Sequence, residues 1–311
     1  MFFDESRIFS FRKMIMSSTK EQREEALMEI LPYQKNDFMD LFKVMNGYPV
    51  IIRLLDPPLH EFLPSKDSDI ATLADSLGIS DSDLKKKIVS LKEFNPMMGH
   101  RGCRLSITYP EIVVMQTKAI IGAAISCSKN GVVVKPEIMV PLVGDVNELK
   151  YIKDIIKEVC DDMISSSNVS IKYMIGTMIE VPRATVMADE IAKEAEFFSF
   201  GTNDLTQMTY GMSRDDASKF LSDYYDKKIF LNDPFMRLDT NGVGSLMKIA
   251  IDKAKSVNPD IELGICGEHG GDPSSVYFCN ELGLDYVSCS PYRVAIARLA
   301  AAKSVIRERL D

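Results

Sequence analysis

The sequence predicts an α/β fold with a parallel sheet, built as a (β/α)8 barrel of the TIM type. Short apolar runs alternate along the chain with longer segments of helical period, and this alternation predicts a parallel sheet covered by helices. Polar residues stand at the carboxyl ends of several predicted strands, where a barrel assembles its site. The length of 311 residues is within the range of one barrel, so we expect residues 1–311 to form a single domain.

Seven apolar runs have the length and composition of strands. A closed parallel barrel needs eight strands, whereas a doubly wound open sheet tolerates seven. The polar residues at different strand ends favour the barrel, so we expect its first strand to be missing or supplied by the far N-terminus. The predicted strands are Pro49–Leu54, Cys103–Ile107, Val133–Pro141, Ile171–Glu180, Glu196–Gly201, Ile261–Cys266 and Asp285–Ser290.

The predicted helices have recognisable starts. Thr108 and Glu111 have the spacing of a capping box, and Asn130 ends that helix. Asp145 is placed to cap a helix over 148–164, and Asp272 to cap one over 274–282. Two longer insertions are expected, one over 57–95 and one over 205–241. The first contains two short helices, and Ser80 opens the one that runs to Lys92.

Composition excludes several classes of partner. The chain is 46% hydrophobic and 26% charged, with a net charge of −8 and no block rich in Lys or Arg, so we expect neither a nucleic-acid nor a membrane partner. We find no signal peptide and no stretch of about 18 apolar residues. The six cysteines have no CxxC spacing, which indicates reduced thiols in a cytoplasmic protein.

Glu180 and Asp204 are two carboxylates at the ends of successive predicted strands. Adjacent strand ends in a barrel lie close together, and carboxylate oxygens with room for water and substrate suit Mg²⁺. The alternative is that each carboxylate caps the helix that follows. The spacing alone leaves both interpretations open.

Arginines in apolar or glycine-rich surroundings are the candidate anion ligands. Arg53 follows three apolar residues, and Arg101 stands in Gly-His-Arg-Gly-Cys. Guanidinium groups match the geometry of carboxylates and phosphates, so the pair predicts a site for a small anion, with a structural salt bridge as the alternative. Arg214, in a polar loop, is the weaker candidate.

The turn formed by Gly201, Thr202 and Asn203 offers backbone N–H groups at a helix start, which can hold a carboxylate. Cys266 ends another strand; a thiol above a bound anion would have a raised pKa and could donate a proton. His269 could orient a neighbour or contact ligand, although a loop histidine is more often structural.

No phosphate-binding loop is present, since the sequence contains neither GxxxxGK[ST] nor GxGxxG before a helix. We therefore expect no ATP binding by this chain. None of the three histidines stands in a small-residue loop suited to carrying phosphate. A phosphohistidine would have to come from elsewhere.

Five segments together resemble the C-terminal phosphoenolpyruvate/pyruvate-binding domain of the pyruvate phosphate dikinase family, and the resemblance covers essentially the whole chain. Phosphoenolpyruvate synthase and enzyme I of the sugar phosphotransferase system are similar at the strand-end Glu, Asn-Asp and Cys. The segments are Arg-Leu-Leu-Asp-Pro-Pro-Leu-His-Glu-Phe-Leu-Pro (53–64), Asn-Pro-Met-Met-Gly-His-Arg-Gly-Cys-Arg-Leu (95–105), Gly-Thr-Met-Ile-Glu-Val-Pro-Arg-Ala (176–184), Ser-Phe-Gly-Thr-Asn-Asp-Leu-Thr-Gln-Met-Thr (199–209) and Cys-Gly-Glu-His-Gly-Gly-Asp-Pro (266–273).

The resemblance implies a phosphotransferase domain in which phosphoenolpyruvate binds Mg²⁺ held by Glu180 and Asp204. Its phosphoryl group would pass to a histidine on a neighbouring domain, and Cys266 would protonate the resulting enolate to give pyruvate. A homodimer through the barrel is also implied. The residues that would contact the ligand are Arg53, Arg101, Gly201, Thr202 and Asn203.

The start of the chain departs from the family pattern. Members of the family carry Arg-Thr-Glu-His directly before a Met-Phe-Phe run like that of residues 1–3, and the arginine lies on the first barrel strand. We therefore expect that strand, the nucleotide-binding domain and the phosphohistidine domain to be absent from this chain. Two alternatives follow: an inactive remnant that only binds ligand or dimerises, and a different enolate-forming barrel enzyme.

Overall fold

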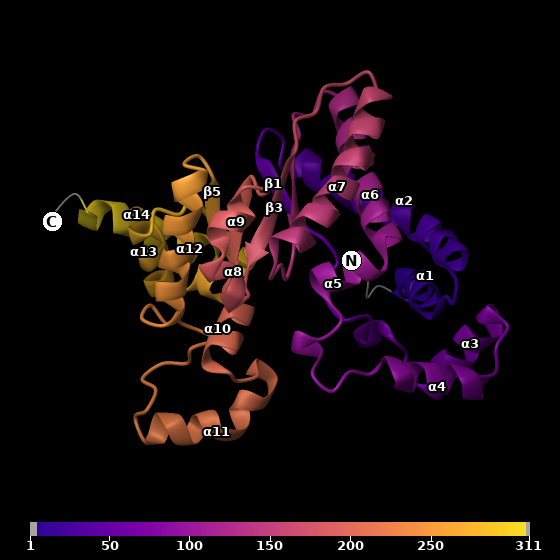
Figure 1. Ribbon diagram of the computed structural model, residues 1–311, viewed down its shortest axis with the longest axis horizontal. Helices are drawn as coiled ribbons and strands as arrows, with labels where there is room; N and C mark the ends of the chain where they lie inside the picture. The colour runs from indigo at the N-terminus through magenta and orange to yellow at the C-terminus, as the bar shows by residue number, and fades with distance from the viewer. Residues whose placement is uncertain (1–4, 309–311) are drawn as a thin grey trace. The chain divides into compact units, whose positions relative to one another are not determined.

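The computed structural model describes residues 5–308, which form two compact units (Figure 1). Unit 1 contains residues up to Met139 together with Lys150–Met174. Unit 2 contains Val140–Leu149 and the chain from Ile175 onward. Neither unit is therefore one continuous segment, because the chain passes between them three times.

Unit 1 is mainly helical and is organised around one apolar core. Phe11 and Phe62 meet edge to face in this core, with ring centroids 4.6 Å apart. The capping box expected elsewhere is found here: Thr19 and Gln22 cap the second helix reciprocally. The elements are α1 (Glu5–Met16), α2 (Lys20–Val44), β1 (Pro49–Arg53), η1 (Leu59–Phe62), α3 (Asp67–Leu77), α4 (Asp81–Leu91), η2 (Pro96–Met98), α5 (Gly102–Thr108), α6 (Pro110–Lys129), β2 (Lys135–Val140, ending in unit 2) and α7 (Val146–Ser165, beginning in unit 2).

Helix α6 is long and apolar enough to cross a membrane, which the sequence analysis did not anticipate. Its most apolar window has a mean hydropathy of 1.3, yet 78% of that window is buried inside the protein. Core helices of globular proteins meet the same criterion. The burial of α6 in unit 1 accounts for its composition.

One predicted strand is wrong. Residues Cys103–Ile107 lie in helix α5. The apolar residues at 103, 105 and 107 alternate like a half-buried strand, but Ser106 is buried as well and its hydroxyl donates to the Gly102 carbonyl one helical turn earlier, at 3.2 Å. Adjacent buried residues such as Leu105 and Ser106 are typical of a helix rather than of a half-buried strand. A segment of five residues is too short for its hydrophobic period to distinguish a helix from a strand.

Unit 2 contains the remaining strands. Four of the seven predicted strands lie here, although β6 is much shorter than expected. The elements are β3 (Met174–Ile179, whose first residue belongs to unit 1), α8 (Pro182–Val186), α9 (Ala188–Ala192), β4 (Phe197–Gly201), α10 (Thr202–Tyr210), α11 (Arg214–Asp226), α12 (Val243–Val257), β5 (Glu262–Cys266), η3 (Glu268–Gly271), α13 (Pro273–Glu281), β6 (Tyr286–Val287), η4 (Pro291–Arg293) and α14 (Val294–Glu308).

Within each unit the strands are parallel and lie in the order in which they occur along the chain. In unit 1, Val50 of β1 pairs with Pro136 of β2. In unit 2 the order is β3-β4-β5-β6. Sequential order is what a barrel requires, whereas a doubly wound sheet reverses its order at a switch point. The fold is therefore α/β of the TIM-barrel type, with six of the eight strands of a closed barrel among residues 5–308.

The expectation that the far N-terminus supplies the first strand is wrong for residues 5–44, because these form helices α1 and α2. Residues 1–4, which include the Met-Phe-Phe run, lie outside the described residues.

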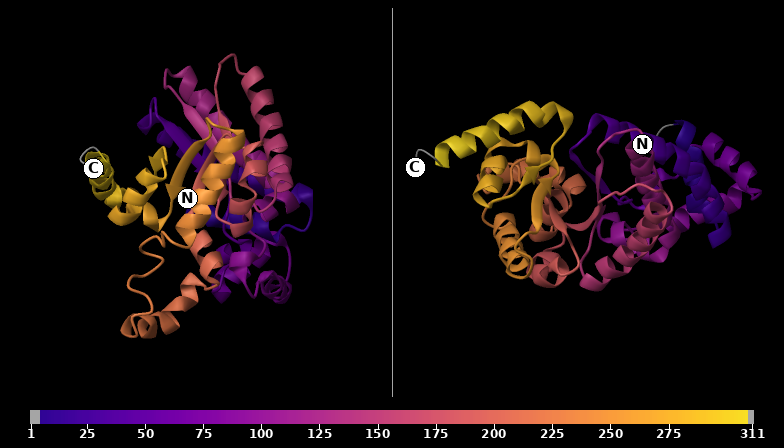
Figure 2. Two further views of the ribbon diagram at one scale, coloured as in Figure 1. Left: turned by 60° about the vertical axis from the view of Figure 1, so that its left-hand side comes forward. Right: turned by 90° about the horizontal axis from the view of Figure 1, so that it is seen from above.

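All five residues of β4 are buried, which fits its nearly continuous apolar sequence. Helices α8 and α9 gather with α12 beside the strands of unit 2, and the α10–α11 segment extends away from them (Figure 1). At the C-terminal end, α14 packs on α13 through a small cluster that includes Val276, Ala297 and Ala300 (Figure 2). Three of the candidate residues follow or end strands of unit 2: Glu180 follows β3, Gly201 ends β4 and Cys266 ends β5.

Three of the predicted helix caps are confirmed. Ser80 Oγ accepts a hydrogen bond from Asp83 N, and Asp145 Oδ1 accepts one from Asn147 N. Asp272 accepts one from Ser275 N at 2.8 Å. The capping box at Thr108 and Glu111 is wrong, because Glu111 instead forms a buried ion pair with Arg23.

Replacing Asp272 by alanine should lower the free energy of unfolding by about 1 kcal/mol at neutral pH, because α13 loses its N-cap. Burial raises the pKa of the Asp272 carboxyl, but hydrogen bonds from Ser274 and Ser275 outweigh it and leave that pKa below its ordinary value. The contribution is therefore present above the ordinary carboxyl pKa and is lost as the pH falls through the lowered one.

Urea unfolding of the parent and the alanine variant at several pH values checks this prediction. Asp272→Asn is the control, since its side-chain oxygen can still accept the cap hydrogen bond. An alanine variant with undiminished stability at pH 7 would contradict the assigned cap.

Candidate active site

In unit 1 both candidate arginines form ion pairs with one carboxylate, Asp56. Arg101 Nη2 lies 2.6 Å from Asp56 Oδ2, and both side chains are only 6% exposed. Arg53 Nη1 lies 3.3 Å from the same oxygen, but the Arg53 side chain is 43% exposed. The sequence offered an anion site or a salt bridge for these arginines. The structure shows the salt bridge, and it leaves Arg53 at the surface of unit 1 where an anion can reach it.

Asp56 was not singled out in the sequence, although it follows Arg53 by three residues and precedes two prolines. Its backbone carbonyl accepts a hydrogen bond from Gly102 N at 3.0 Å, which fixes the start of α5. Among the described residues, its Oδ1 atom has no hydrogen-bond partner. Two cations on one buried carboxylate leave the cluster with a net positive charge, which favours an anion.

In unit 2, Glu180 directly follows β3 and is 1% exposed. Leu142 N donates to Glu180 Oε1 at 2.6 Å, and Leu142 has a positive φ of 61°. A Cβ atom on Gly201 would lie 2.6 Å from Glu180 Oε2. Only glycine at position 201 therefore lets the end of β4 approach the carboxylate.

The first turn of α10 carries Thr202, Asn203 and Asp204. Among residues 5–308, no side chain caps this helix, and the N-terminus of a helix offers N–H groups and a partial positive charge to an anion. Asp204 is 9% exposed, and its Oδ1 atom accepts a hydrogen bond from Gln207 Nε2 at 3.4 Å. The alternative that Asp204 serves as the helix cap is not supported by this geometry.

Cys266 ends β5 beside Gly201, its partner in the parallel register. Its Sγ atom donates to the Phe200 carbonyl at 3.6 Å, and the side chain is partly exposed. Burial raises the pKa of two other thiols, Cys160 and Cys279, to about 12. Cys160 and Cys279 are therefore buried core thiols, unlike Cys266.

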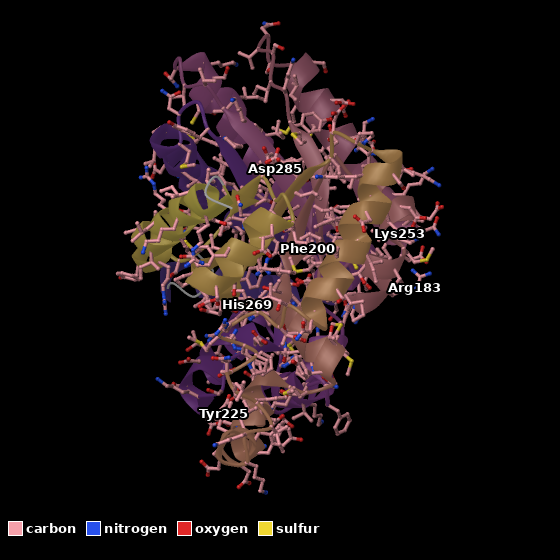
Figure 3. All side chains as sticks on the ribbon, turned by 90° about the vertical axis from the view of Figure 1, so that its left-hand side faces the viewer. Arg183, Phe200, Tyr225, Lys253, His269 and Asp285 are labelled. Atoms are coloured by element: carbon pink, nitrogen blue, oxygen red, sulfur yellow. The ribbon has the colours of Figure 1, made fainter. Side chains whose placement is uncertain are left out.

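The loop after Cys266 contacts the first turn of α10 at two points. Glu268 N donates to Asn203 Oδ1 at 3.4 Å. The imidazole of His269 lies 2.7 Å from the Thr202 hydroxyl through Nδ1 and is completely buried. Figure 3 shows His269 on the side of Phe200 away from Asp285, which precedes β6. Since parallel strands end on that side, His269 lies at the carboxyl ends of the strands.

Arg214, the weaker candidate, lies near the same loop. Its guanidinium group is 3.7 Å from Glu268 Oε1, and its backbone N–H donates to Gln207 Oε1 at 2.7 Å. The side chain is 42% exposed. Arg214 was expected in a loop but is the first residue of α11. Gln207 thus connects the start of α11 to Asp204, a link for which the sequence gave no signal.

The donor set of unit 2 fits Mg²⁺. Glu180 and Asp204 follow the neighbouring strands β3 and β4, and Mg²⁺ is commonly held by one or two carboxylates while substrate and water oxygens complete an octahedron. No group of three or more His, Cys, Asp or Glu side chains among residues 5–308 has the geometry of a metal site. A closed site made only of protein ligands, as for structural zinc, is therefore not found in the described part of the chain.

Residues 1–306 match the family described as PEP-utilising enzyme, PEP-binding domain. The chain is 55% identical over 310 residues to a Clostridium symbiosum protein named pyruvate, phosphate dikinase, and this match covers 99% of the chain and 36% of that protein. It is 56% identical over 308 residues to an Arabidopsis thaliana protein named pyruvate, phosphate dikinase 1, chloroplastic, with 98% and 32% covered. The chain thus spans about a third of the length of these curated relatives. It belongs to the family of PEP-utilising enzymes and corresponds to their PEP-binding domain.

Proposed function

We propose that this domain binds phosphoenolpyruvate and pyruvate and carries out the half-reaction that interconverts them in a dikinase-type phosphoryl transfer. The observation that carries the proposal is the grouping in unit 2: Glu180, Asp204 and Cys266 follow or end the consecutive strands β3, β4 and β5. The family match and the names of the relatives support the same ligand class.

Glu180 and Asp204 are proposed to hold Mg²⁺, which when bound would neutralise charge on the phosphoryl and enolate oxygens. The uncapped N–H groups of the first turn of α10 would receive the ligand carboxylate, with Asn203 beside them. In unit 1, Arg53 and Arg101 are proposed as ligands for the phosphate and carboxylate groups.

The reaction is a transfer followed by a protonation. The bond between phosphorus and the enol oxygen of phosphoenolpyruvate breaks, and phosphorus bonds to a histidine nitrogen. The enolate that remains takes the proton of the Cys266 thiol at its methylene carbon, which gives pyruvate and a thiolate. In the opposite direction the thiolate removes a methyl proton.

The phosphohistidine is proposed to belong to a domain outside these 311 residues, because the curated relatives are about three times as long as the chain. We also propose that the domain forms a homodimer, which sedimentation at several concentrations tests. A monomer at all concentrations would contradict that part of the proposal.

Calorimetric titration with phosphoenolpyruvate, with and without Mg²⁺, tests the proposed ligand. Magnesium-dependent binding by the parent is expected, and Glu180→Gln and Asp204→Asn should each weaken it by more than about tenfold, because each removes a charged metal ligand. Asp189→Asn is the matched control, since Asp189 pairs with Lys253 on the helices of unit 2.

Unchanged binding by both site variants would contradict the metal assignment. If the folded parent chain did not bind phosphoenolpyruvate, the alternative of an inactive remnant of the family domain would be favoured.

A further inference from the structure

His269 is a completely buried histidine whose two ring nitrogens both have hydrogen-bond partners. Nε2 lies 2.9 Å from the carbonyl oxygen of Pro234, and Nδ1 lies 2.7 Å from Thr202 Oγ1. The imidazole therefore joins three segments of unit 2: the loop after β5, the segment between α11 and α12, and the first turn of α10.

The partners determine the tautomer. A carbonyl oxygen can only accept a hydrogen bond, so Nε2 must carry a proton. In a neutral imidazole, Nδ1 then has a lone pair and accepts, which means that the Thr202 hydroxyl is the donor. The neutral ring is favoured because burial lowers the pKa of His269; Arg214 also lowers it, while the bond to Pro234, Asp272 and Glu268 act in the opposite direction.

The Thr202 hydroxyl has one proton and two possible acceptors. One is His269 Nδ1 at 2.7 Å, and the other is the Cys266 carbonyl at 3.5 Å. The shorter contact takes the proton when His269 is present as the Nε2–H tautomer. Without that acceptor the hydroxyl would be free to rotate toward the Cys266 carbonyl, and the hydrogen bond from Thr202 to His269 would be lost.

We propose that His269, as its Nε2–H tautomer, is a positioning residue that fixes Thr202 and thereby the first turn of α10. A second hydrogen bond between the same two segments, from Glu268 N to Asn203 Oδ1, supports this arrangement. The inference deepens the proposed function, on which its ligand-binding part rests, because the turn contains Thr202, Asn203 and Asp204. It assigns a role to the His of the Glu-His-Gly-Gly run.

The tautomer is tested first, in a measurement that does not depend on ligand binding. The chain has three histidines, so long-range ¹⁵N–¹H correlation spectra of the parent and of His269→Gln assign the His269 ring by difference. We expect one protonated and one unprotonated nitrogen, with the proton on Nε2. A proton on Nδ1, or a ring with two protonated nitrogens at pH 7, would overturn the inference.

The positioning role is tested with four variants by amide hydrogen exchange. In His269→Ala and Thr202→Val, exchange at Thr206 and Gln207 should rise by about tenfold or more relative to the rest of unit 2, since the turn loses its bond. His269→Gln should stay close to the parent, because its amide can accept from Thr202 and donate to Pro234. Thr202→Ser keeps the hydroxyl and should behave likewise.

Binding of phosphoenolpyruvate with Mg²⁺ gives the second readout. His269→Ala should bind about tenfold more weakly than the parent, while His269→Gln binds within about threefold. If the parent itself does not bind, the proposed function fails while the exchange and tautomer results still decide the positioning role. Equal amide hydrogen exchange at Thr206 and Gln207 in the parent and all four variants would overturn the positioning role of His269.

Discussion

Replacing Cys266 by alanine is expected to reduce the exchange of pyruvate methyl protons by about 10²–10⁴-fold, the usual contribution of a positioned acid or base. The thiol ends β5 next to Gly201 and donates a hydrogen bond to the Phe200 carbonyl. Among the described residues, no other cysteine is the last residue of a strand. Binding of phosphoenolpyruvate with Mg²⁺ should change by less than about threefold, because the thiol is not a metal ligand.

Deuterium incorporation into pyruvate, followed by proton NMR with the parent and the variant, measures this effect. Cys266→Ser is the isosteric test, since its hydroxyl fills the same space but is far less acidic than a thiol. Cys289→Ala is the control, because Cys289 is also partly exposed in unit 2. Exchange by Cys266→Ala at the parent rate would show that another group moves the proton.

Replacing Arg101 by methionine should lower the free energy of unfolding by about 3–5 kcal/mol, the usual result of removing one partner of a buried ion pair. Asp56 is only 6% exposed and would keep a single cation, Arg53, at 3.3 Å. Arg53→Met should cost no more than about 1 kcal/mol, because the Arg53 side chain is 43% exposed and Asp56 would keep its shorter bond to Arg101.

Urea unfolding of both single variants checks this difference. The double variant Asp56→Leu with Arg101→Met should recover part of the loss, since it removes the uncompensated carboxylate together with its partner. If both single arginine variants lowered the free energy of unfolding equally, the assignment of Arg101 as the buried partner of Asp56 and Arg53 as the exposed one would be contradicted. If Arg53 is a ligand for an anion, its variant should bind phosphoenolpyruvate more weakly although its stability is unchanged.

Six of the seven predicted strands and the class of fold are found in the structure, because the apolar runs that predict these strands are continuous. The run Phe197–Gly201 is apolar throughout and is a strand with all five residues buried. The caps at Ser80, Asp145 and Asp272 depend on local spacing, and the structure confirms them. The segment Cys103–Ile107 was misassigned because alternation over five residues also fits a short helix with one buried side.

Long-range partners could not be predicted. Glu111 has the spacing of a cap residue, but the cation of Arg23, 88 positions away, competes for it. Helices α1 and α2 were not predicted, because the expected first strand was assigned to the same part of the chain. Asp56 could have been found, since an acid three residues after a strand-end arginine is a local signal. The bond from His269 to Thr202 spans 67 positions and has no such signal.

The division of the chain between the two units has a consequence for biosynthesis. Unit 1 lacks its last segment until Met174 has been made, although most of its residues precede Val140. At a synthesis rate of about 5–20 residues per second, the part of α6 around Gly122, which lies next to Met163 of α7, therefore waits for seconds before α7 is complete. A stop codon between residues 140 and 174 would leave both units incomplete, because each unit takes residues from both sides of that segment or from within it.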